Sequence, residues 1–246
     1  MNIWALADLH LCHSSPEKSM SIFGWGNYMD KICKNWTHLI GKEDLILIAG
    51  DISWAKTSED ALADLQWLDQ LPGKKIILKG NHDRWWVSNR KMEALLPPSI
   101  QFINTNAITI NNISIGGARL WDTQEYDFDN YIKVIKGTTL RQPQDIEQSE
   151  KIFNKELNRL ETSLKQIDPS AKLKVAMTHF PPINAKLEQS KASQLLETYN
   201  IDIAVFGHLH SIDQSKPIFG LKNGIKYLLT SADYLNFQPI SIRKSL

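Results

Sequence analysis

The feature that most constrains the fold of this chain is a set of five short apolar runs, each followed directly by polar residues. Each run has the length of one buried strand. The polar residues after them are rich in Asp, Asn and His, whose side chains bind metals or move protons. Because parallel strands bring their carboxyl ends to one edge of a sheet, the sequence predicts an α/β fold with a site at that edge. The five motifs are Asp8-Leu9-His10, Gly50-Asp51, Gly80-Asn81-His82-Asp83, Thr178-His179 and Gly207-His208-Leu209-His210.

The first third of the chain alternates between strand and helix patterns. Apolar residues at helical spacing separate the apolar runs, and Gly41 and Pro72-Gly73 end the two helical stretches. This order predicts parallel strands joined by right-handed crossovers. The expected elements are strands at 2–7, 45–49 and 75–78, and helices at 27–40 and from Ser58 to the Pro72-Gly73 turn.

After Pro97-Pro98 the pattern changes to apolar residues at every second position. Asn111-Asn112 separates two such pairs, which predicts a β-hairpin and a second, mixed sheet. We expect Phe102-Ile103 near its start, and 225–230 and 239–242 as further strands of it. A helix is predicted from 145 to 167, with strands at 173–177 and 203–206 around another helix near 186–199.

Taken in order, the five motifs resemble those of the calcineurin-like metallophosphoesterases, and the resemblance runs from Asp8 to His210. It implies an α/β fold in which a two-sheet β-sandwich is flanked by helices, a four-layer αββα arrangement. At 246 residues the chain is long enough for a single domain of this kind, spanning 1–246. The acidic and aromatic segment near 122–143 fits no period, so we expect a surface insertion or lid there.

The resemblance also implies a pair of divalent metal ions. It assigns Asp8, His10 and His210 to the first ion, Asn81, His179 and His208 to the second, and Asp51 to a bridge between them. Imidazole nitrogens mixed with carboxylate and amide oxygens suit manganese, iron or zinc better than calcium. Such a pair holds a bridging hydroxide that attacks phosphorus.

His82 lies beside the expected ligands rather than among them. In the resembled family this position contacts the phosphate and protonates the leaving oxygen, a task suited to an imidazole. We expect Asp83 to assist catalysis by holding the tautomer of His82. A solvated turn acid, or an ion pair with Arg84, is an equally good interpretation of Asp83.

Three further side chains are candidates for substrate binding. Arg119 and Arg84 each carry a guanidinium that can pair with phosphate oxygens, and we rank Arg119 first because it precedes the expected lid. The alternative for both is a surface salt bridge. His13 follows the first motif and is the third candidate.

The net charge and the residues after Asp51 narrow the class of possible substrates. Lys plus Arg number 28 against 27 Asp plus Glu, so no global field favours a nucleic acid. The arginine that serine/threonine protein phosphatases of this family carry after Gly-Asp is missing, because Asp51 is followed by Ile52-Ser53-Trp54. We therefore expect a hydrolase, a phosphatase or phosphodiesterase, acting on a small soluble phosphorylated substrate. The alternatives are a metal-dependent nuclease, which needs a basic groove, and a catalytically silent scaffold of the same fold.

The N-terminus predicts no export signal and no membrane span. The apolar run that begins the chain ends at Asp8 and has no basic residue before it. With only Cys12 and Cys33, no disulfide framework is expected. These features predict a cytoplasmic protein, and they leave the oligomeric state undetermined.

Overall fold

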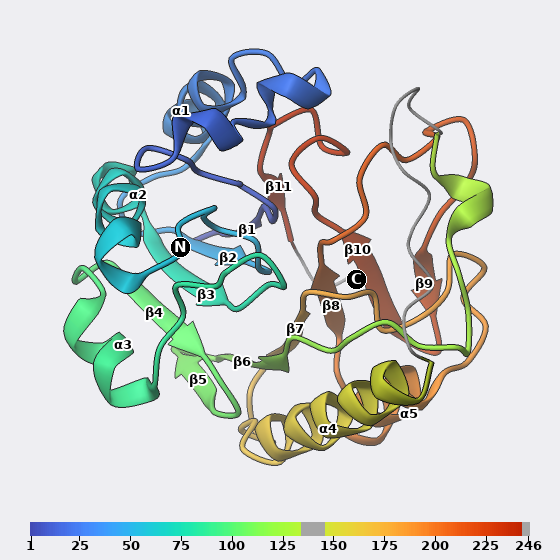
Figure 1. Cartoon of the computed structure of the whole chain (residues 1–246). Helices are drawn as coiled ribbons and strands as arrows, with labels where there is room; N and C mark the ends of the chain where they lie inside the picture. Colours follow the sequence, from blue (N-terminus) through green and yellow to red (C-terminus); the bar gives the residue numbers. More distant parts are fainter. Residues whose placement is uncertain (134–145, 243–246) are drawn as a thin grey trace.

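The chain folds into two β-sheets packed face to face between two layers of helices (Figure 1). The computed structural model describes residues 1–133 and 146–242. The first sheet has the order β11-β1-β2-β3-β4 and the second the order β5-β6-β7-β8-β10-β9. This is the four-layer αββα architecture that the sequence predicts.

The first sheet carries three of the five motifs. Its strands β1 (Ile3–Ala5), β2 (Leu45–Ile48), β3 (Lys74–Leu78) and β4 (Ile100–Ile103) run parallel. Strand β11 (Ile240–Ser241) pairs antiparallel with β1. The helices that follow in sequence, which pack against this sheet, are α1 (Tyr28–Leu39), α2 (Ser58–Gln70) and α3 (Asn89–Leu95).

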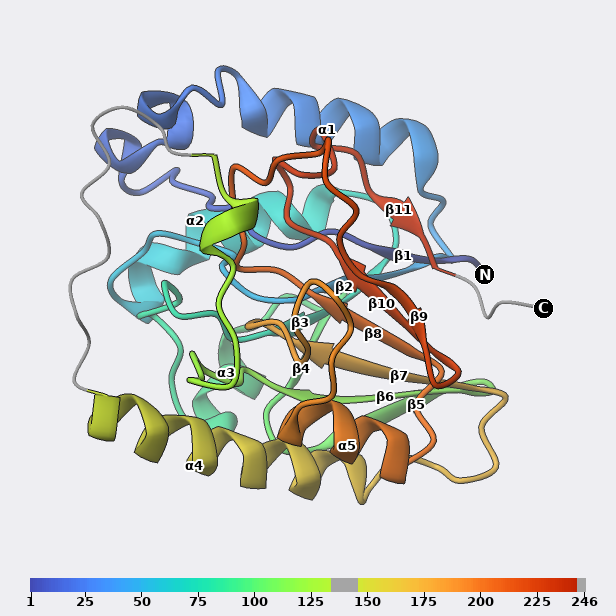
Figure 2. The same ribbon diagram turned by 90° about the vertical axis from the view of Figure 1, so that its right-hand side faces the viewer.

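The second sheet carries the other two motifs. Strands β6 (Ile113–Ala118), β7 (Leu173–Thr178), β8 (Ile203–Phe206) and β10 (Ile225–Leu229) are parallel. The edge strands β5 (Ala107–Ile110) and β9 (Gly220–Lys222) are antiparallel to their neighbours. Helices α4 (Ile146–Leu164) and α5 (Lys191–Thr198) cover its outer face, on the opposite side of the molecule from α1 (Figure 2).

Alternate residues of each strand face different cores. In β2, Leu45 and Leu47 pack between the sheets, whereas Ile46 and Ile48 pack against the helices. Val175 of β7 meets the first sheet from the other side. Because both faces of these strands are buried, they appear in the sequence as continuous apolar runs. The motifs after the runs are therefore attached to strands that are packed on both faces.

Two predicted strands belong to the other sheet. Strand β4, which contains Phe102-Ile103, pairs with β3, and β11 pairs with β1, so both lie in the first sheet. Strand β11 is held there by the Ile242 N–H, which donates to the Ile3 carbonyl. The hairpin around Asn111-Asn112 is confirmed, with Asn111 in the left-handed region at φ 54°. Helix α3 was not predicted.

The predicted insertion at 122–143 is described only as far as residue 133. That part contains a short 3₁₀ turn, Asp129–Tyr131, and Ile132 forms an isolated bridge to Ile212. Residues 134–143 lie outside the described residues, as does the first residue of the helix predicted from 145. No helix within 1–133 and 146–242 has the length and apolar character needed to cross a membrane.

Candidate metal centre

The polar motifs meet where the strand ends of the two sheets come together. Four of the residues expected to bind metal have a left-handed backbone, which costs free energy for a residue other than glycine. Such strain concentrates at functional sites, where the surrounding structure enforces it. The four are Asp8 (φ 57°), His10 (φ 44°), Asp51 (φ 52°) and His208 (φ 72°).

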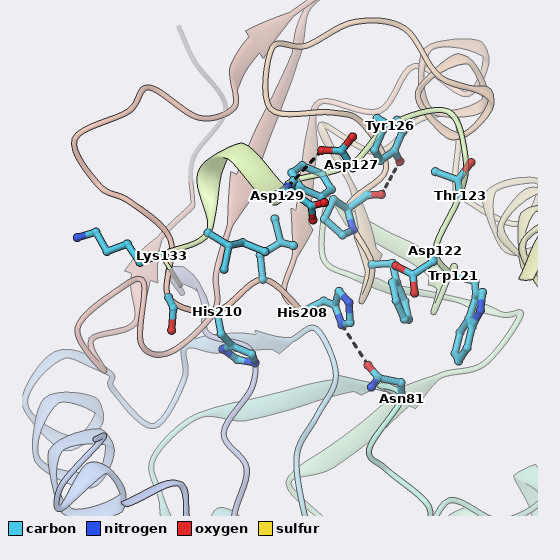
Figure 3. Close-up of a pocket in the computed structure, with 16 residues that line it drawn as sticks. Asn81, Trp121, Asp122, Thr123, Tyr126, Asp127, Asp129, Lys133, His208 and His210 are labelled. Carbon is cyan, nitrogen blue, oxygen red and sulfur yellow. Dashed lines mark hydrogen bonds between the residues drawn. The ribbon is translucent and has the colours of Figure 1, made fainter. Parts of the chain in front are cut away.

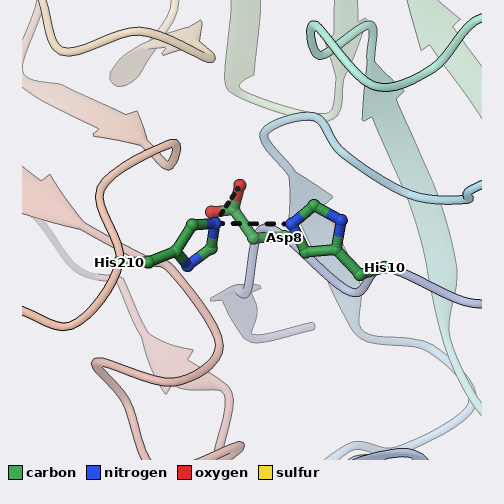
Figure 4. A group of neighbouring side chains, drawn as sticks. All are labelled: Asp8, His10 and His210. Atoms are coloured by element: carbon green, nitrogen blue, oxygen red, sulfur yellow. Dashed lines mark hydrogen bonds and ion pairs between the residues drawn. The ribbon is translucent and has the colours of Figure 1, made fainter. Parts of the chain in front are cut away.

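One end of the centre consists of Asp8, His10 and His210 (Figure 4). Each offers one ligand atom, and these atoms lie within 4.8 Å of one another. The Nε2 atoms of the two imidazoles are 3.4 Å apart. The structure therefore brings together the three residues that the resemblance assigns to the first ion.

Asp51 lies between the two ends. Its Oδ2 is 3.8 Å from His10 Nε2 and 3.5 Å from His179 Nε2. Asp8, Asp51 and His179 form a second group whose ligand atoms lie within 4.8 Å of one another. Asp51 thus occupies the position expected of a bridging carboxylate, and Asp8 lies close to both ends.

The other end consists of Asn81, His179 and His208. Asn81 Oδ1 is 2.6 Å from His179 Nε2. It is also 3.2 Å from His208 Nδ1, the contact drawn in Figure 3. His179 Nδ1 donates to the Ala49 carbonyl at 3.0 Å, which fixes the ring with Nε2 facing the centre. All seven predicted ligands are therefore gathered in one place.

The two histidines of the Gly207-His208-Leu209-His210 motif do not lie on a fully extended segment. On extended backbone, residues two apart alternate back to the same side, which would point both imidazoles the same way. The left-handed φ of His208 breaks that alternation, and the two rings contact different partners. His208 reaches Asn81, whereas His210 reaches Asp8.

The donor set fits divalent transition metals. Burial raises the pKa of Asp8 to about 8 and also raises the pKa of Asp51, since a carboxylate is costly away from water. A bound cation would offset that cost. Burial lowers the pKa of His179 to about 4, which favours the neutral imidazole that binds metal.

Glycines allow the motifs to approach closely. A Cβ on Gly207 would lie 2.3 Å from Asp8 Oδ2, and one on Gly80 would lie 2.0 Å from Asp51 Oδ1. Neither glycine has a positive φ, so the close approach of neighbouring atoms, rather than a sharp left-handed turn, requires glycine at both positions. Gly50, with φ 96°, does make such a turn.

Gly80→Ala is expected to displace Asp51 and lower the metal content of the protein. Overpacking of this kind costs roughly 1–3 kcal/mol of unfolding free energy. Denaturant unfolding and elemental analysis measure the two effects. The matched control is Gly41→Ala, whose Cβ would lie 3.7 Å from its nearest neighbour. Wild-type metal content in Gly80→Ala would contradict the close-approach argument.

His82 lies beside the centre, as expected. Its backbone N–H donates to Asp51 Oδ1 at 2.8 Å, and its Nε2 is 3.9 Å from Asp51 Oδ2. The side chain is 38% exposed, and Trp54 packs against the ring with centroids 4.3 Å apart. Burial lowers the pKa of His82. Its ring is therefore held near the metal ligands but is open to substrate.

The structure supports none of the three roles predicted for Asp83, which were to hold the His82 tautomer, to be a solvated turn acid and to pair with Arg84. The carboxylate is buried, which raises its pKa to about 6, and so it is not a solvated turn acid. Within the described chain it accepts from Trp85 Nε1 and from backbone N–H groups, and it pairs with neither His82 nor Arg84. The backbone donors are Ile52, Ser53 and Gly80. Asp83 thus joins two motif loops and acts as a positioning residue.

The two arginines are placed in the reverse of the predicted order. Arg119 Nη2 lies 3.4 Å from Glu156 Oε1, and its guanidinium stacks over Trp121, so the salt-bridge interpretation describes it better. Arg84 is exposed and lines a cavity together with His82. Arg84 is therefore the better placed of the two to meet a substrate.

His13 is turned away from the centre. Its Nδ1 lies 2.7 Å from Asp64 Oδ1, and its backbone N–H donates to the same oxygen at 2.9 Å. Asp64 belongs to α2 and is fully buried. His13 therefore connects its loop to a helix, and the structure does not support a role in substrate binding.

One acid in the centre was missed by the sequence analysis. Asp233 Oδ1 accepts from His210 Nδ1 at 2.9 Å, which leaves Nε2 facing Asp8 and His10. Burial alone would lower the pKa of His210, but the hydrogen bond to Asp233 and the nearby carboxylates raise it to about 9. Asp233 follows the end of β10, the same signal that marked the other motifs.

Asp233→Asn is expected to weaken metal binding about tenfold, as loss of a carboxylate behind a histidine ligand does in other metal sites. Of the seven candidate ligands, Asp233 contacts only His210, so the loss of affinity should be confined to one ion. Metal titration followed by calorimetry measures it. Asp60→Asn, on the exposed start of α2, is the matched control. Equal affinities for variant and wild type would exclude this role.

A cavity of about 500 Å³ borders the centre (Figure 3). Asn81, His208 and His210 form part of its wall. The described part of the predicted insertion forms another part, where the Tyr126 hydroxyl donates to the Pro181 carbonyl at 2.8 Å. The insertion therefore contributes to the site.

Comparisons with known proteins agree with this geometry. A family model described as calcineurin-like phosphoesterase matches residues 1–211. Two curated relatives, each called Gene 66 protein, come from Mycobacterium phages D29 and L5. They are 36% and 32% identical over 83 and 99 residues, which is 34% and 39% of this chain. The matches span 41% and 46% of those proteins, less than half of their length.

Among solved structures, phosphopantetheinyl hydrolase from Mycobacterium tuberculosis has a TM-score of 0.51 with this chain. The superposition covers 96% of this chain and 90% of that one, at 16% sequence identity. Identity this low supports the shared fold and nothing finer. The family model, which covers most of the chain and every motif above, decides the assignment: the chain belongs to the calcineurin-like phosphoesterase family.

Proposed function

We propose that this chain hydrolyses phosphomonoesters or phosphodiesters of a small soluble substrate, with two divalent ions bound by the seven motif residues. The observation that carries the proposal is the position of Asp51, whose Oδ2 lies within 3.9 Å of ring nitrogens of His10, His82 and His179. Manganese, iron or zinc suits this donor set. When bound, such ions polarise a phosphoryl group and supply a nucleophile at neutral pH.

The protein's own residues would orient the substrate and move the proton. His82 Nε2 is the proposed donor to the leaving oxygen. Asp51 Oδ1 fixes the backbone of His82, and Trp54 packs against its ring. Because Trp54 also stacks on His10, with centroids 4.9 Å apart, it sets the position of the proton donor relative to the metal ligands.

The cavity in Figure 3 favours a small substrate over a nucleic-acid strand. Among the described residues, its lining includes the three acids Asp122, Asp127 and Asp129 and one lysine, Lys133. An acidic wall repels a polyanion, whereas a nuclease needs a basic groove. This feature disfavours the nuclease alternative.

A hydrolysis screen tests the proposal. Purified protein is stripped with a chelator, reloaded with manganese, zinc, magnesium or no metal, and assayed on aryl monoesters, aryl diesters and nucleotides. We expect turnover only after metal is added. Absence of turnover with every metal and ester, in a protein that binds less than one ion per chain, would support the catalytically silent scaffold instead.

A further inference from the structure

A second cavity, of about 370 Å³, lies beside His82 and shares no lining residue with the cavity in Figure 3. We refer to it as the His82 cavity. Trp54 and Arg84 line it together with His82. His82 Nε2 lies 3.9 Å from Asp51 Oδ2, so this residue of the cavity wall is next to the candidate metal centre.

The charged side chains among the described residues that line the His82 cavity are mainly cationic. Lys18, Lys56 and Arg84 line it, against a single acid, Glu17. Lys18 Nζ donates to the Trp54 carbonyl at 2.8 Å, so its ammonium is held at the wall. Within residues 1–133 and 146–242, neither Lys56 nor Arg84 forms an ion pair. In the described part of the chain, these two cations therefore have no anionic partner and can meet an anion of a ligand.

The same cavity has an apolar side. Ile22 and Phe23 line it and are 72% and 49% exposed. Exposed large apolar side chains that adjoin a pocket indicate contact with a ligand rather than a role in the core. A group with an apolar or aromatic body and an anionic substituent would satisfy both sides of the cavity.

The role of this cavity follows from the proposed function, because it depends on His82 being the proton donor. In hydrolysis the oxygen of water bonds to phosphorus, and the bond from phosphorus to the leaving oxygen breaks. That bonding pair moves to the leaving oxygen, which takes the Nε2 proton of protonated His82, while the attacking water gives up a proton to solvent and His82 regains one from solvent. The leaving oxygen must therefore lie next to His82, and the group attached to it extends into the His82 cavity.

We propose that the His82 cavity binds the leaving group of the phosphoester, and that this leaving group carries an anionic substituent recognised by Arg84 and Lys56. The opposite charge of the two cavities supports a fixed orientation. The group that stays on phosphorus would face the wall with Asp127 and Asp129, where an anion is unfavourable. The substrate class is thus an asymmetric diester, anionic on its leaving side.

Three aryl diesters test the orientation. The parent is p-nitrophenyl phenyl phosphate, which releases p-nitrophenol. One analogue carries a carboxylate on the nitrophenyl ring, which leaves, and the other carries it on the phenyl ring, which stays. We expect kcat/KM to rise about fivefold for the first analogue, the upper range for an exposed ion pair, and not to rise for the second. An equal effect of the two carboxylates would overturn the orientation.

Arg84→Gln tests the recognition. The ratio of kcat/KM for the first analogue to kcat/KM for the parent should fall to near one, chiefly because KM for the first analogue rises. Arg84→Lys should restore part of the preference. The matched control, Arg90→Gln, removes an exposed charge on α3 that lines neither cavity.

The outcomes separate the two proposals. Hydrolysis of all three diesters with no change of preference in Arg84→Gln or Lys56→Gln would overturn the leaving-group assignment and leave the phosphoesterase proposal intact. If the protein hydrolyses none of the three diesters, and no other ester with any of the metals, both proposals are overturned. Binding of the leaving group alone can also be measured. We expect the free carboxylated nitrophenol to inhibit hydrolysis, and we expect its inhibition constant to be higher in Arg84→Gln.

Discussion

His82→Ala is expected to lower kcat for a diester with a poor leaving group, such as diphenyl phosphate, by roughly 10²- to 10⁴-fold. The physical reason is the position of Nε2, which would protonate the leaving oxygen. p-Nitrophenolate is stable without a proton, so the same variant should lose much less activity on bis(p-nitrophenyl) phosphate. Comparing the two substrates distinguishes loss of proton donation from general damage.

Metal content is the control for that variant. The side chain of His82 lies outside the seven-ligand set, and the contact with Asp51 Oδ1 comes from its backbone N–H, which alanine keeps. We therefore expect His82→Ala to bind both ions. A variant that loses metal, or one that loses equal activity on both esters, would contradict the assignment of His82 as proton donor.

Asp51→Asn should abolish binding of one ion and lower activity by about a thousandfold or more. The carboxylate is 1% exposed and lies between His10 and His179, so the substitution removes the negative charge that both ends of the centre share. Elemental analysis should show at most one ion per chain. Asn has nearly the same shape, which keeps packing intact.

Asp30→Asn is the matched control for Asp51→Asn, because it makes the same chemical change on the exposed start of α1. It should bind metal and turn over substrate as the wild type does. Thermal unfolding of both variants checks their folds. Two ions per chain in Asp51→Asn would remove this residue from its proposed bridging position.

The strand ends could be predicted from the sequence because their signal is local. Leu45 to Ala49 and Ile203 to Phe206 are buried on both faces, so each appears as an unbroken apolar run that ends at its motif. The sheet to which each strand belongs was harder to predict, because the sequences of β4 and β11 do not indicate which strand they pair with. Their pairing depends on strands far away in sequence.

The same difference between local and long-range signals explains which site residues could be predicted from the sequence. Asp8 and Asp51 were recognised because their motifs combine residue type with position at a strand end. Asp83 and His13 were misjudged because their partners, the Ile52 and Ser53 backbone for one and Asp64 for the other, come from separate segments. No local pattern predicts these partners.

Asp233 is a different case, because the signal was present and went unused. It follows β10 at a short distance, as the other site residues follow their strands, but it lies in no motif of the resembled family. Inspecting every strand end, rather than only those that match a known motif, would have identified it.

The pairing of β11 with β1 affects the order in which the molecule can assemble. Trp4 lies opposite Ser241, so the first strand gains its second neighbour only after more than two hundred further residues have been synthesised. His210 likewise joins Asp8 from a distant segment. Contacts between such remote positions slow folding. A growing chain on the ribosome would therefore expose one edge of β1 until late, and stalled intermediates that end before residue 240 should be more open to proteases than the finished protein.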